Sequence, residues 1–567
     1  MIINIIGNNN SYGNTADFKL LTYTLKKLFR KRKFDFKFID NYQYKCEYAD
    51  INIFFGLINN TLIPYSKYNI FIPNIELCIK SNIEYLNNID IILVRSLYTL
   101  EIFKTYHKNV KYISWRSSDR YSHTVDKDYN NWLHVSSFSS YKYTNELINL
   151  WKPEYPKLTI LANCKFKVIP KKVQDNIEYI LDYMEDIKYE KLFNKCGVHI
   201  YPSEIETFGH TIQEAKLCKS IVLTTDGGSM KELINSNSGF LIPVRKKIRL
   251  KKLLGSKFVI NNNLDTLVNK IGGLSTESVL EITDIARKEA LQNHTKHEVL
   301  TNEVFTNIFK QLDKTKNQDL ELTKIPEKDL PKISICTLTY NRKNMFKLAL
   351  MNYVNMSYPK DKVEWIIVDD SDEDKTVLEL LPDETKRYEL NIKYYRLNDK
   401  LSIGKKRNFS VERCTNDIIV FMDDDDYYPT DSVKYRVMSM LENKKDCVFC
   451  TTVGCFHINK LISIINVPPI KEPYNERISE STLCFTKQFW LDKKFIEDDE
   501  DYEGREFIKD RITQYMELNW EYTIISLLHS KNKTNRVNVG NTPNGCHYGW
   551  SDELFVFITS LDKKETL

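Results

Sequence analysis

Short apolar runs alternate with stretches of helical periodicity along the whole chain, a pattern typical of parallel sheets covered by helices. A first series of runs predicts strands at 2–6, 36–39, 51–55, 70–72, 89–94 and 112–113. After a polar stretch at 117–131, a second series predicts strands at 132–135, 158–161, 198–201, 221–224 and 239–242. A third series begins with a strand at 333–339. With 567 residues the chain is too long for one hydrophobic core, so we expect several α/β domains.

The segment 311–332 separates the second series from the third. It is polar and contains two prolines, which indicates a connection between domains. The two successive α/β series before it predict a pair of Rossmann-like domains that face each other across a cleft. We therefore predict domains at 1–130 and 131–315, a linker at 316–331 and a third domain at 332–567.

Composition excludes several classes of protein. The formal net charge is only +5, and the basic clusters at 26–33 and 245–252 have no aromatic stacking platform, so we expect no nucleic-acid partner. No run of about 18 apolar residues predicts a membrane span. The N-terminus lacks the pattern of a signal peptide, so a cytoplasmic protein is expected. Cys447 and Cys450 form one C-x-x-C without a second pair at zinc-site spacing, which indicates thiols in a strand core.

The strongest chemical signal is an apolar strand that runs into four carboxylates within 417–429, which reads DIIVFMDDDDYYP. Neighbouring carboxylates at a strand end repel one another, and this raises their pKa values. A divalent cation removes that penalty, and oxygen ligands suit Mg²⁺ or Mn²⁺, which in turn binds a diphosphate. Asp423 and Asp425 point the same way in an extended segment. The alternative, a solvated acidic loop, does not require the buried strand before it.

Three further segments precede the acidic strand in a fixed order. They are Thr339-Tyr-Asn-Arg342 after the opening strand, WIIVDDSD at 365–372, and Gly404-Lys-Lys-Arg-Asn408 at a helix start. In this order the segments resemble family 2 glycosyltransferases of the GT-A fold. The resemblance implies that Asp423 and Asp425 are the metal ligands and that Arg407 meets a phosphate. It also implies donor contacts from Thr339, Tyr340, Asn341, Arg342, Asp369, Asp370, Gly404, Arg407, Asn408 and Asp424.

An inverting transferase also needs a general base beside the acceptor hydroxyl. In the family this carboxylate follows the metal motif, where 495–507 reads FIEDDEDYEGREF. Glu503 is the first choice, and Asp501 and Asp498 are the alternatives, because burial must single out the base. A run of surface charge is the competing interpretation. His529 lies in a segment that resembles one folding over the donor, so it is expected to ligate the metal or touch a phosphate, unless it is an ordinary core or surface histidine.

A different motif occupies 201–215, which reads YPSEIETFGHTIQEA. A strand ends, Gly209 permits close backbone approach and a helix begins, so Glu206 and Glu214 can flank one ligand at the helix N-terminus. This resembles the E-x7-E motif of family 4 glycosyltransferases of the GT-B fold. The resemblance implies that Glu206 meets the donor sugar and Glu214 the ribose. It also implies diphosphate contacts from Gly227 and Gly228, a phosphate contact from Lys142 and an acceptor-side loop at Gly13.

The first part of the chain departs from that family. Its glycine-rich start is reduced to 7–13, and no convincing catalytic histidine precedes the motif; His107 and His123 are candidates. The alternative for this half is a domain pair that binds glycan without turnover.

The motifs together predict a bifunctional glycosyltransferase that acts on a glycan or glycoprotein. Its C-terminal head is expected to use Mn²⁺ or Mg²⁺ and a UDP-sugar with inversion. Its N-terminal head is expected to need no metal and, by resemblance, to retain configuration. The main alternative is a glycan-binding or scaffolding protein with one active head. A nucleotide-sugar pyrophosphorylase is disfavoured because no glycine- and basic-rich triphosphate loop is present near the first strand. The abundance of Asn, Ile, Lys and Tyr fits an AT-rich genome, such as that of a large DNA virus.

Overall fold

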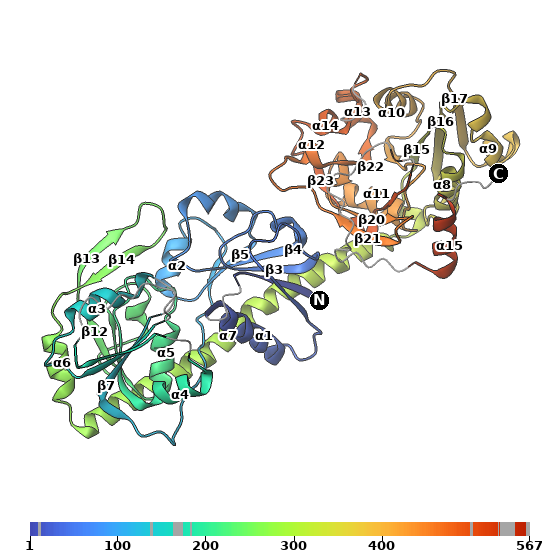
Figure 1. Cartoon of the computed structure of the whole chain (residues 1–567). Helices are drawn as coiled ribbons and strands as arrows, with labels where there is room; N and C mark the ends of the chain where they lie inside the picture. The colour runs from blue at the N-terminus through green and yellow to red at the C-terminus, as the bar shows by residue number, and fades with distance from the viewer. Residues whose placement is uncertain are drawn as a thin grey trace. The chain divides into compact units, whose positions relative to one another are not determined.

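The computed structural model describes residues 1–8, 13–136, 140–162, 174–181, 184–498, 503–530, 532 and 550–562. The chain forms two compact units. One consists of Met1–Lys45 and Ala49–Ile308, and the other of Cys46–Tyr48 and Phe309–Leu567. Both units are α/β, as the sequence predicts (Figure 1).

The first unit contains two six-stranded parallel sheets, the first in the order β2-β1-β3-β4-β5-β6. Its central strands are buried on both faces, which explains why they read as continuous apolar runs. The strands are β1 (Ile2–Ile6), β2 (Asp35–Ile39), β3 (Ala49–Gly56), β4 (Ser66–Pro73), β5 (Ile91–Val94) and β6 (Val110–Tyr112). The α-helices of this half are α1 (Gly13–Leu28) and α2 (Leu97–Phe103). All six predicted strands are confirmed, with shifted ends.

The second sheet has the order β12-β11-β10-β7-β8-β9. Its strands are β7 (Asp128–Ser136), β8 (Lys157–Ala162), β9 (Ile177–Ile180), β10 (Cys196–Tyr201), β11 (Ile221–Thr225) and β12 (Phe240–Ile242). The sequence does not predict β9, because this short edge strand carries a charged residue. Around the sheet lie α3 (Thr144–Leu150), α4 (Asp186–Lys195), α5 (His210–Leu217), α6 (Asp265–Gly272) and the hairpin of β13 (Val244–Arg249) and β14 (Ser256–Ile260). Its core includes the edge-to-face pair Trp132 and Trp151.

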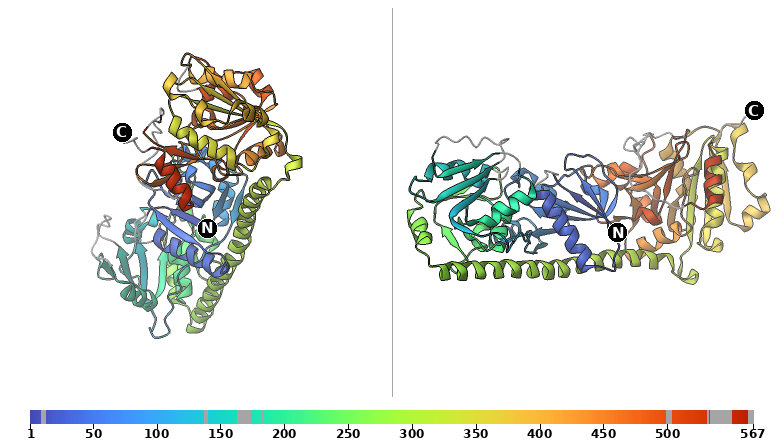
Figure 2. Two further views of the ribbon diagram at one scale, coloured as in Figure 1. Left: turned by 90° about the vertical axis from the view of Figure 1, so that its right-hand side faces the viewer. Right: turned by 60° about the horizontal axis from the view of Figure 1, so that its bottom comes forward.

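A 48-residue helix, α7 (Thr276–Thr323), continues into the predicted linker at 316–331 (Figure 2). The polar composition there belongs to the end of a solvated helix, which tolerates charge along its exposed sides. The helix ends shortly before Pro326, since a proline disfavours helical backbone in the residue before it. Neither α7 nor any other helix in the described ranges is both long and apolar enough to cross a bilayer.

The second unit is built on a seven-stranded sheet in the order β17-β16-β15-β18-β22-β19-β23. The strands are β15 (Ile333–Thr339), β16 (Val363–Asp369), β17 (Ile392–Arg396), β18 (Ile418–Phe421), β19 (Cys447–Cys450), β22 (Ser479–Thr486) and β23 (Tyr515–Glu517). A small sheet adds β20 (Val453–His457), β21 (Ile462–Asn466) and β24 (Ile525–Leu528). The α-helices are α8 (Lys343–Asn355), α9 (Glu384–Glu389), α10 (Ile403–Glu412), α11 (Ser432–Glu442), α12 (Tyr474–Arg477), α13 (Lys487–Asp492), α14 (Glu503–Ile508) and α15 (Asp552–Ser560). Cys447 and Cys450 are buried in β19, which confirms the prediction of strand-core thiols.

The position of β15 explains where a site can form in this unit. The chain moves from β15 to β16 and β17 on one side and returns to β18 on the other, and these four strands are parallel. Open α/β sheets bind ligands outside the carboxyl ends of the strands at such a switch point. The segments that follow β15, β16 and β18 all leave the sheet at that edge.

Candidate active sites

The switch point of the second unit collects three of the predicted donor segments. Thr339 pairs with Asp369 in the register of β15 and β16, so the two segments that follow start at the same level. Asn341 has a φ of 54°, and its amide donates to Ser371 Oγ at 2.8 Å. The acidic tetrad follows β18 on the other side of β15. Residues that are distant in sequence are thereby gathered at one edge.

The acidic tetrad contains a group of atoms that fits a divalent cation. Carboxylate oxygens of Asp423, Asp425 and Asp426 all lie within 4.8 Å of one another. Burial raises the pKa of Asp423, and it raises that of Asp424 to about 6. Close oxygen donors of this kind, two of them on buried aspartates, suit Mg²⁺ or Mn²⁺. The sequence indicates Asp423 and Asp425 and misses Asp426, whose Oδ1 also accepts from Ser526 Oγ at 2.8 Å.

Arg342 and His529 both contact this acidic group. Arg342 Nη1 donates to Asp424 Oδ1 at 3.1 Å and to Asp425 Oδ2 at 2.5 Å. His529 Nε2 lies 3.1 Å from Asp425 Oδ2. The structure therefore brings the predicted donor residue and the predicted histidine ligand to the same carboxylate. Whether His529 itself ligates a metal stays a prediction.

The two aspartates after β16 are held by the protein itself. The carboxylate of Asp369 accepts hydrogen bonds from the amides of Ser371 and Val377, both at 2.9 Å, and from Tyr394 Oη at 2.8 Å. These bonds fix the turn after the strand. Asp370 is paired with Lys406 at 2.7 Å.

Helix α10 supplies the remaining predicted donor residues. A Cβ on Gly404 would lie 1.7 Å from the carbonyl oxygen of Ile496, so only glycine fits there. The side chain of Asn408 accepts from Trp490 Nε1 at 3.0 Å and donates to the carbonyl of Phe495 at 2.9 Å. In the structure Asn408 thus anchors the segment before 498.

Arg407 connects the acidic group to the predicted base. Its Nε donates to Glu503 Oε1 at 3.1 Å, and its Nη1 lies 3.9 Å from Asp423 Oδ1. Both Arg407 and Glu503 are buried. The sequence indicates a phosphate contact for this arginine, and the structure places it between two carboxylates.

The three predicted bases differ in their surroundings. Glu503 is buried at the start of α14, as a base singled out by burial requires. The side chain of Asp498 is 98% exposed and lies 4.0 Å from Lys405, so it has no such burial. Asp501 lies outside the described residues.

Sequence reasoning misses Glu480, on β22. Burial and the neighbouring Glu503 raise its pKa to about 8. A Cβ on Gly504 would lie 2.5 Å from Glu480 Oε1, so the glycine lets α14 start against this carboxyl. An isolated glutamate in an ordinary strand gives no signal in the sequence.

In the first unit, the structure brings Glu206 and Lys142 together. Lys142 Nζ donates to Glu206 Oε1, and Ser203 Oγ donates to the same oxygen at 2.9 Å. Gly209 has a φ of 86° at the N-terminus of α5, which glycine adopts readily. Glu214 is buried on α5; burial raises its pKa, while Arg120, with Nε 3.5 Å away, opposes the rise.

The glycine turn after β11 is required by packing. Gly228 has a φ of 56°, and a Cβ on Gly227 would lie 2.4 Å from the ring of Phe258. Gly13 begins α1, at the edge of the described residues.

Residues from α1 and from the segment after β4 also reach the E-x7-E segment, and the sequence does not indicate them. Asp17 accepts from His210 Nε2 and from Arg95 Nη1, both at 2.8 Å. Burial alone would raise the pKa of Asp17, but the charge of Arg95 and the hydrogen bonds from His210 and Trp115 hold it below its usual value. Glu76 accepts from Thr207 Oγ1, and burial together with Glu206 raises its pKa. Carboxylates widely spaced in sequence cannot be recognised as neighbours without the tertiary fold.

The two histidines suggested by the sequence have other surroundings. Nε2 and Nδ1 of His107 lie 2.9 and 3.1 Å from the carbonyl oxygens of Ile89 and Asn109, so its ring holds two loops together. His123 is exposed.

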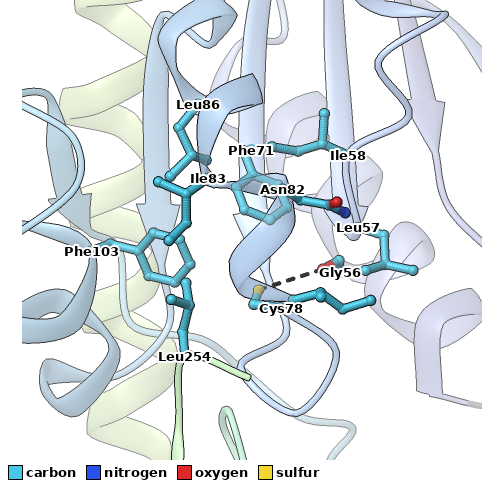
Figure 3. Close-up of a pocket in the computed structure, with 11 residues that line it drawn as sticks. Gly56, Leu57, Ile58, Phe71, Cys78, Asn82, Ile83, Leu86, Phe103 and Leu254 are labelled. Carbon is cyan, nitrogen blue, oxygen red and sulfur yellow. Dashed lines mark hydrogen bonds between the residues drawn. The ribbon is translucent and has the colours of Figure 1, made fainter. Parts of the chain in front are cut away.

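A cavity of about 20 Å³ in the first unit is not a donor site (Figure 3). Its lining is mostly apolar and includes Phe71, Ile83, Leu86 and Phe103. The volume is about that of one water molecule, and apolar voids of this size stay dry. It is a gap in the packing.

The second unit has an acidic group at a sheet switch point and the first has an E-x7-E segment at the start of α5, the features that the two resemblances predict for GT-A and GT-B glycosyltransferases. Comparison with protein families agrees. Residues 334–499 match the model of glycosyl transferase family 2, and residues 116–258 match the model of glycosyl transferases group 1. The chain therefore carries a domain of each of these two glycosyltransferase families.

Two named relatives are similar in sequence to short parts of the chain. The poly(ribitol-phosphate) beta-glucosyltransferase of Bacillus spizizenii is 30% identical over 115 residues, 20% of this chain and 18% of the relative. The poly(ribitol-phosphate) beta-N-acetylglucosaminyltransferase TarS of Staphylococcus aureus is 27% identical over 124 residues, 22% of this chain and 21% of the relative. The chain spans about a fifth of the length of these relatives.

Solved structures are similar over larger parts. S. aureus TarS 1–349 with UDP-GlcNAc covers 35% of this chain and 60% of its own, with a TM-score of 0.29 and 18% identity. Anabaena HepE with UDP and glucose covers 54% of this chain and 100% of its own, with a TM-score of 0.40 and 14% identity.

Proposed function

We propose that the second unit is a metal-dependent, inverting glycosyltransferase head that uses a UDP-sugar. The observation that carries this proposal is the group formed by Asp423, Asp425 and Asp426, at the switch point of the sheet and beside the Arg407–Glu503 pair. A group that binds the diphosphate through a cation and a carboxylate that accepts the proton would then lie within one site.

In this proposal the three aspartates hold the cation. When bound, Mn²⁺ or Mg²⁺ would stabilise the charge that develops on the leaving diphosphate. Arg342 neutralises Asp424 and Asp425 and orients both carboxylates. His529 supports Asp425 from the other side, or joins the ligands.

Glu503 is our choice for the residue that takes the proton from the acceptor hydroxyl. Its hydrogen bond with Arg407 Nε holds the carboxylate in place. Asp501 is the alternative base, and the exposed Asp498 is the weaker candidate. Burial and the neighbouring Glu503 raise the pKa of Glu480 to about 8, so the Glu480 carboxyl would be mostly protonated at neutral pH.

For the first unit we propose a second, metal-independent head. Lys142, the N-terminus of α5 beyond Gly209 and the Gly227–Gly228 turn would hold the diphosphate. Glu206 would meet the donor sugar and Glu214 the ribose. By resemblance this head would retain configuration.

One observation favours the alternative, a first unit that binds glycan without turnover. Lys142 is paired with Glu206, and Arg120 lies beside Glu214, so groups that should bind the donor neutralise each other. A donor would have to displace these pairs.

The acceptor is proposed from the acceptors that the relatives' names give. Both relatives reported above act on poly(ribitol-phosphate), a polyhydroxylated polymer, which supports a glycan-type acceptor rich in hydroxyls.

Two heads on one chain could add successive sugars, because tethering raises the effective concentration of the intermediate. A mixture of Asp425→Ala and Glu206→Ala chains at low concentration should then complete the product more slowly than the unaltered chain. Equal rates would contradict the tethering.

The decisive test is release of nucleoside diphosphate from a panel of nucleotide sugars, with glycan acceptors present, in Mn²⁺ and in EDTA. We expect a UDP-sugar activity that is lost in EDTA and in Asp425→Ala. Asp417→Ala, which removes an exposed carboxylate at the other end of the same strand segment, is the matched control and should stay active. Turnover that is equal in EDTA and in Asp425→Ala would refute the metal-dependent head.

The same assay tests the first unit. An activity that persists in EDTA and is lost only in Glu206→Ala would establish a second head. If every donor turnover depends on Asp425, and Glu206→Ala changes only glycan binding, the first unit is a binding module.

A further inference from the structure

A basic hairpin in the first unit has no role in the proposed chemistry. It is formed by β13 and β14, which pair with each other in a two-stranded sheet of their own (Figure 1). Residues 244–260 include seven lysines and arginines and no aspartate or glutamate. Six of the seven are exposed and form no ion pair with a carboxylate among the described residues: Arg245, Lys246, Lys247, Arg249, Lys251 and Lys252.

The base of the hairpin packs beside the candidate donor site of this unit. Phe258 on β14 lies against the glycine turn after β11, where a Cβ on Gly227 would be 2.4 Å from its ring. Lys257 Nζ is 2.7 Å from Glu204 Oε2, and the amide of Phe258 donates to the carbonyl of Glu204 at 2.9 Å. Glu204 closely precedes the predicted donor residue Glu206. The basic surface therefore begins next to the residues proposed to hold the donor.

The turn of the hairpin reaches the segment that follows β4, in the other half of the unit. The amide of Leu254 donates to the carbonyl of Cys78 at 3.0 Å, and the amide of Lys80 donates to the carbonyl of Lys252 at 2.9 Å. Lys80 Nζ also donates to the carbonyl of Leu250 at 3.1 Å, which adds a further positive charge. Contacts at both ends hold the hairpin, so its basic side chains form a surface with a fixed position beside the site.

Stability gives a poor account of this charge. Like charges on neighbouring positions of a hairpin repel one another, and a two-stranded hairpin is only marginally stable by itself. Lysines on exposed strands also prevent sheets from pairing edge to edge. That role does not require charge on both faces and in the turn, whereas Lys246 and Lys247 point to opposite faces and Lys251 follows the strand. A negatively charged partner would remove the repulsion.

The composition of the hairpin narrows the class of partner. Its one aromatic residue, Phe258, is buried, so the hairpin offers no platform for stacked bases. No large apolar side chain of 244–260 is exposed, whereas surfaces that enter a lipid interface combine basic residues with exposed apolar ones. Lys247 and Arg249 lie on one face of β13, and alternate residues of an antiparallel strand are roughly 6.8 Å apart. Charges in such a row fit an extended chain with repeated anionic groups.

We propose that the β13–β14 hairpin binds the acceptor of the first unit, and that this acceptor is a glycan polymer with repeated phosphate or carboxylate groups. The inference rests on the proposed function of that unit. The polymer lies along the basic side chains, and the hydroxyl that receives the sugar reaches the site beside Glu206. Each lysine or arginine that contacts an anionic group releases a counterion, so binding weakens as the salt concentration rises.

The test is binding of fluorescently labelled polymers to the full chain, measured by fluorescence anisotropy at several salt concentrations. The probes are inorganic polyphosphate, polygalacturonate and neutral dextran of similar length. We expect one or both anionic polymers to bind, which identifies the anionic group, and no measurable binding of dextran. The triple substitution Lys246→Gln, Arg249→Gln and Lys251→Gln should weaken binding of the anionic polymer about 10- to 100-fold. It should also lower the slope of log Kd against log salt concentration by about 2.

The matched control removes three exposed basic residues from the other basic cluster of the same unit, through Arg30→Gln, Lys31→Gln and Lys33→Gln. It changes the net charge equally and should bind the polymers as the unaltered chain does. Equal losses in the two triple variants would mean attraction to net charge only and would overturn the inference. So would the absence of binding to either anionic polymer, or tighter binding of a single-stranded oligonucleotide or of phosphatidylserine vesicles.

Polymer binding does not require turnover, so this inference and the proposed function fail separately. If turnover of a donor is lost in Glu206→Ala but no anionic polymer binds, the first unit is an active head and the inference is wrong. If the hairpin variant loses polymer binding while Glu206→Ala changes no turnover, the hairpin is a polymer-binding surface and the proposed head is wrong.

Discussion

Replacing Arg342 with methionine should expose the competition between this arginine and a metal for Asp425. In the structure Arg342 Nη1 contacts both Asp424 and Asp425, whose side chains are almost fully buried. The substitution keeps most of the side-chain volume and removes the charge. The two carboxylates then lose their common cationic partner.

The size of the effect follows from burial. Removing one partner of a buried pair costs about 3–5 kcal/mol, because the other charge stays desolvated. The Arg342 side chain is 19% exposed, so we expect the lower end, about 3 kcal/mol, in the absence of metal. Mn²⁺ should restore much of this, since a ligand at 100 times its Kd stabilises the folded state by about 2.7 kcal/mol. Mn²⁺ should also bind more tightly once the competing guanidinium is gone.

The assay is thermal or urea unfolding of the full chain in EDTA and across a Mn²⁺ titration. The transition of the second unit is identified as the one that Mn²⁺ shifts and that no longer shifts in Asp425→Ala. Arg387→Met, on α9, is the control, because this arginine donates to the carbonyl of Pro382 and forms no ion pair with a carboxylate among the described residues. Two results would refute the reasoning: a variant as stable as the unaltered chain in EDTA, or a smaller stabilisation by Mn²⁺ in the variant.

Three further predictions concern packing and pH. Gly404→Ala should lower the free energy of unfolding by about 1–3 kcal/mol and reduce UDP-sugar turnover, because the new Cβ would overlap the Ile496 carbonyl. Gly272→Ala, whose Cβ meets nothing within 4 Å, is the control, and equal melting temperatures for the two variants would contradict this reasoning. His134 is buried, and desolvation lowers its pKa to about 4, so the unfolded chain binds a proton at a higher pH than the folded chain does. Stability should therefore fall as pH drops from 6.5 towards 4, by about 1.4 kcal/mol per pH unit. Urea unfolding at pH 7 and pH 5 should show this loss, and His134→Gln should reduce it. Glu480 has a raised pKa, so its contribution to stability is full below pH 4.5 and is lost as pH rises towards 8; Glu480→Gln should therefore be relatively more stable at pH 9 than at pH 5, and an identical pH profile would count against the buried carboxyl.

The sequence by itself determined the layers and the main motifs. Apolar runs such as 2–6 and 333–339 read as strands because parallel strands are buried on both faces. The acidic run after β18 and the E-x7-E segment are contiguous in sequence, so their spacing alone indicates a cation site and a helix N-terminus. Polarity was less informative: the predicted linker at 316–331 begins as the end of α7, because an exposed helix and an irregular connection can have the same composition.

Only the tertiary structure decided which charges become partners. Arg407 reaches Glu503, Lys406 reaches Asp370, and His210 reaches Asp17, across separations that no sequence spacing reveals. Such pairs form because the fold removes each charge from water, and a buried charge must then find an opposite charge or a hydrogen bond. Local sequence fixes the periodicity of a segment. Desolvation depends on how the segments pack, and it is desolvation that selects the partners of buried charges and raises the pKa of Glu480.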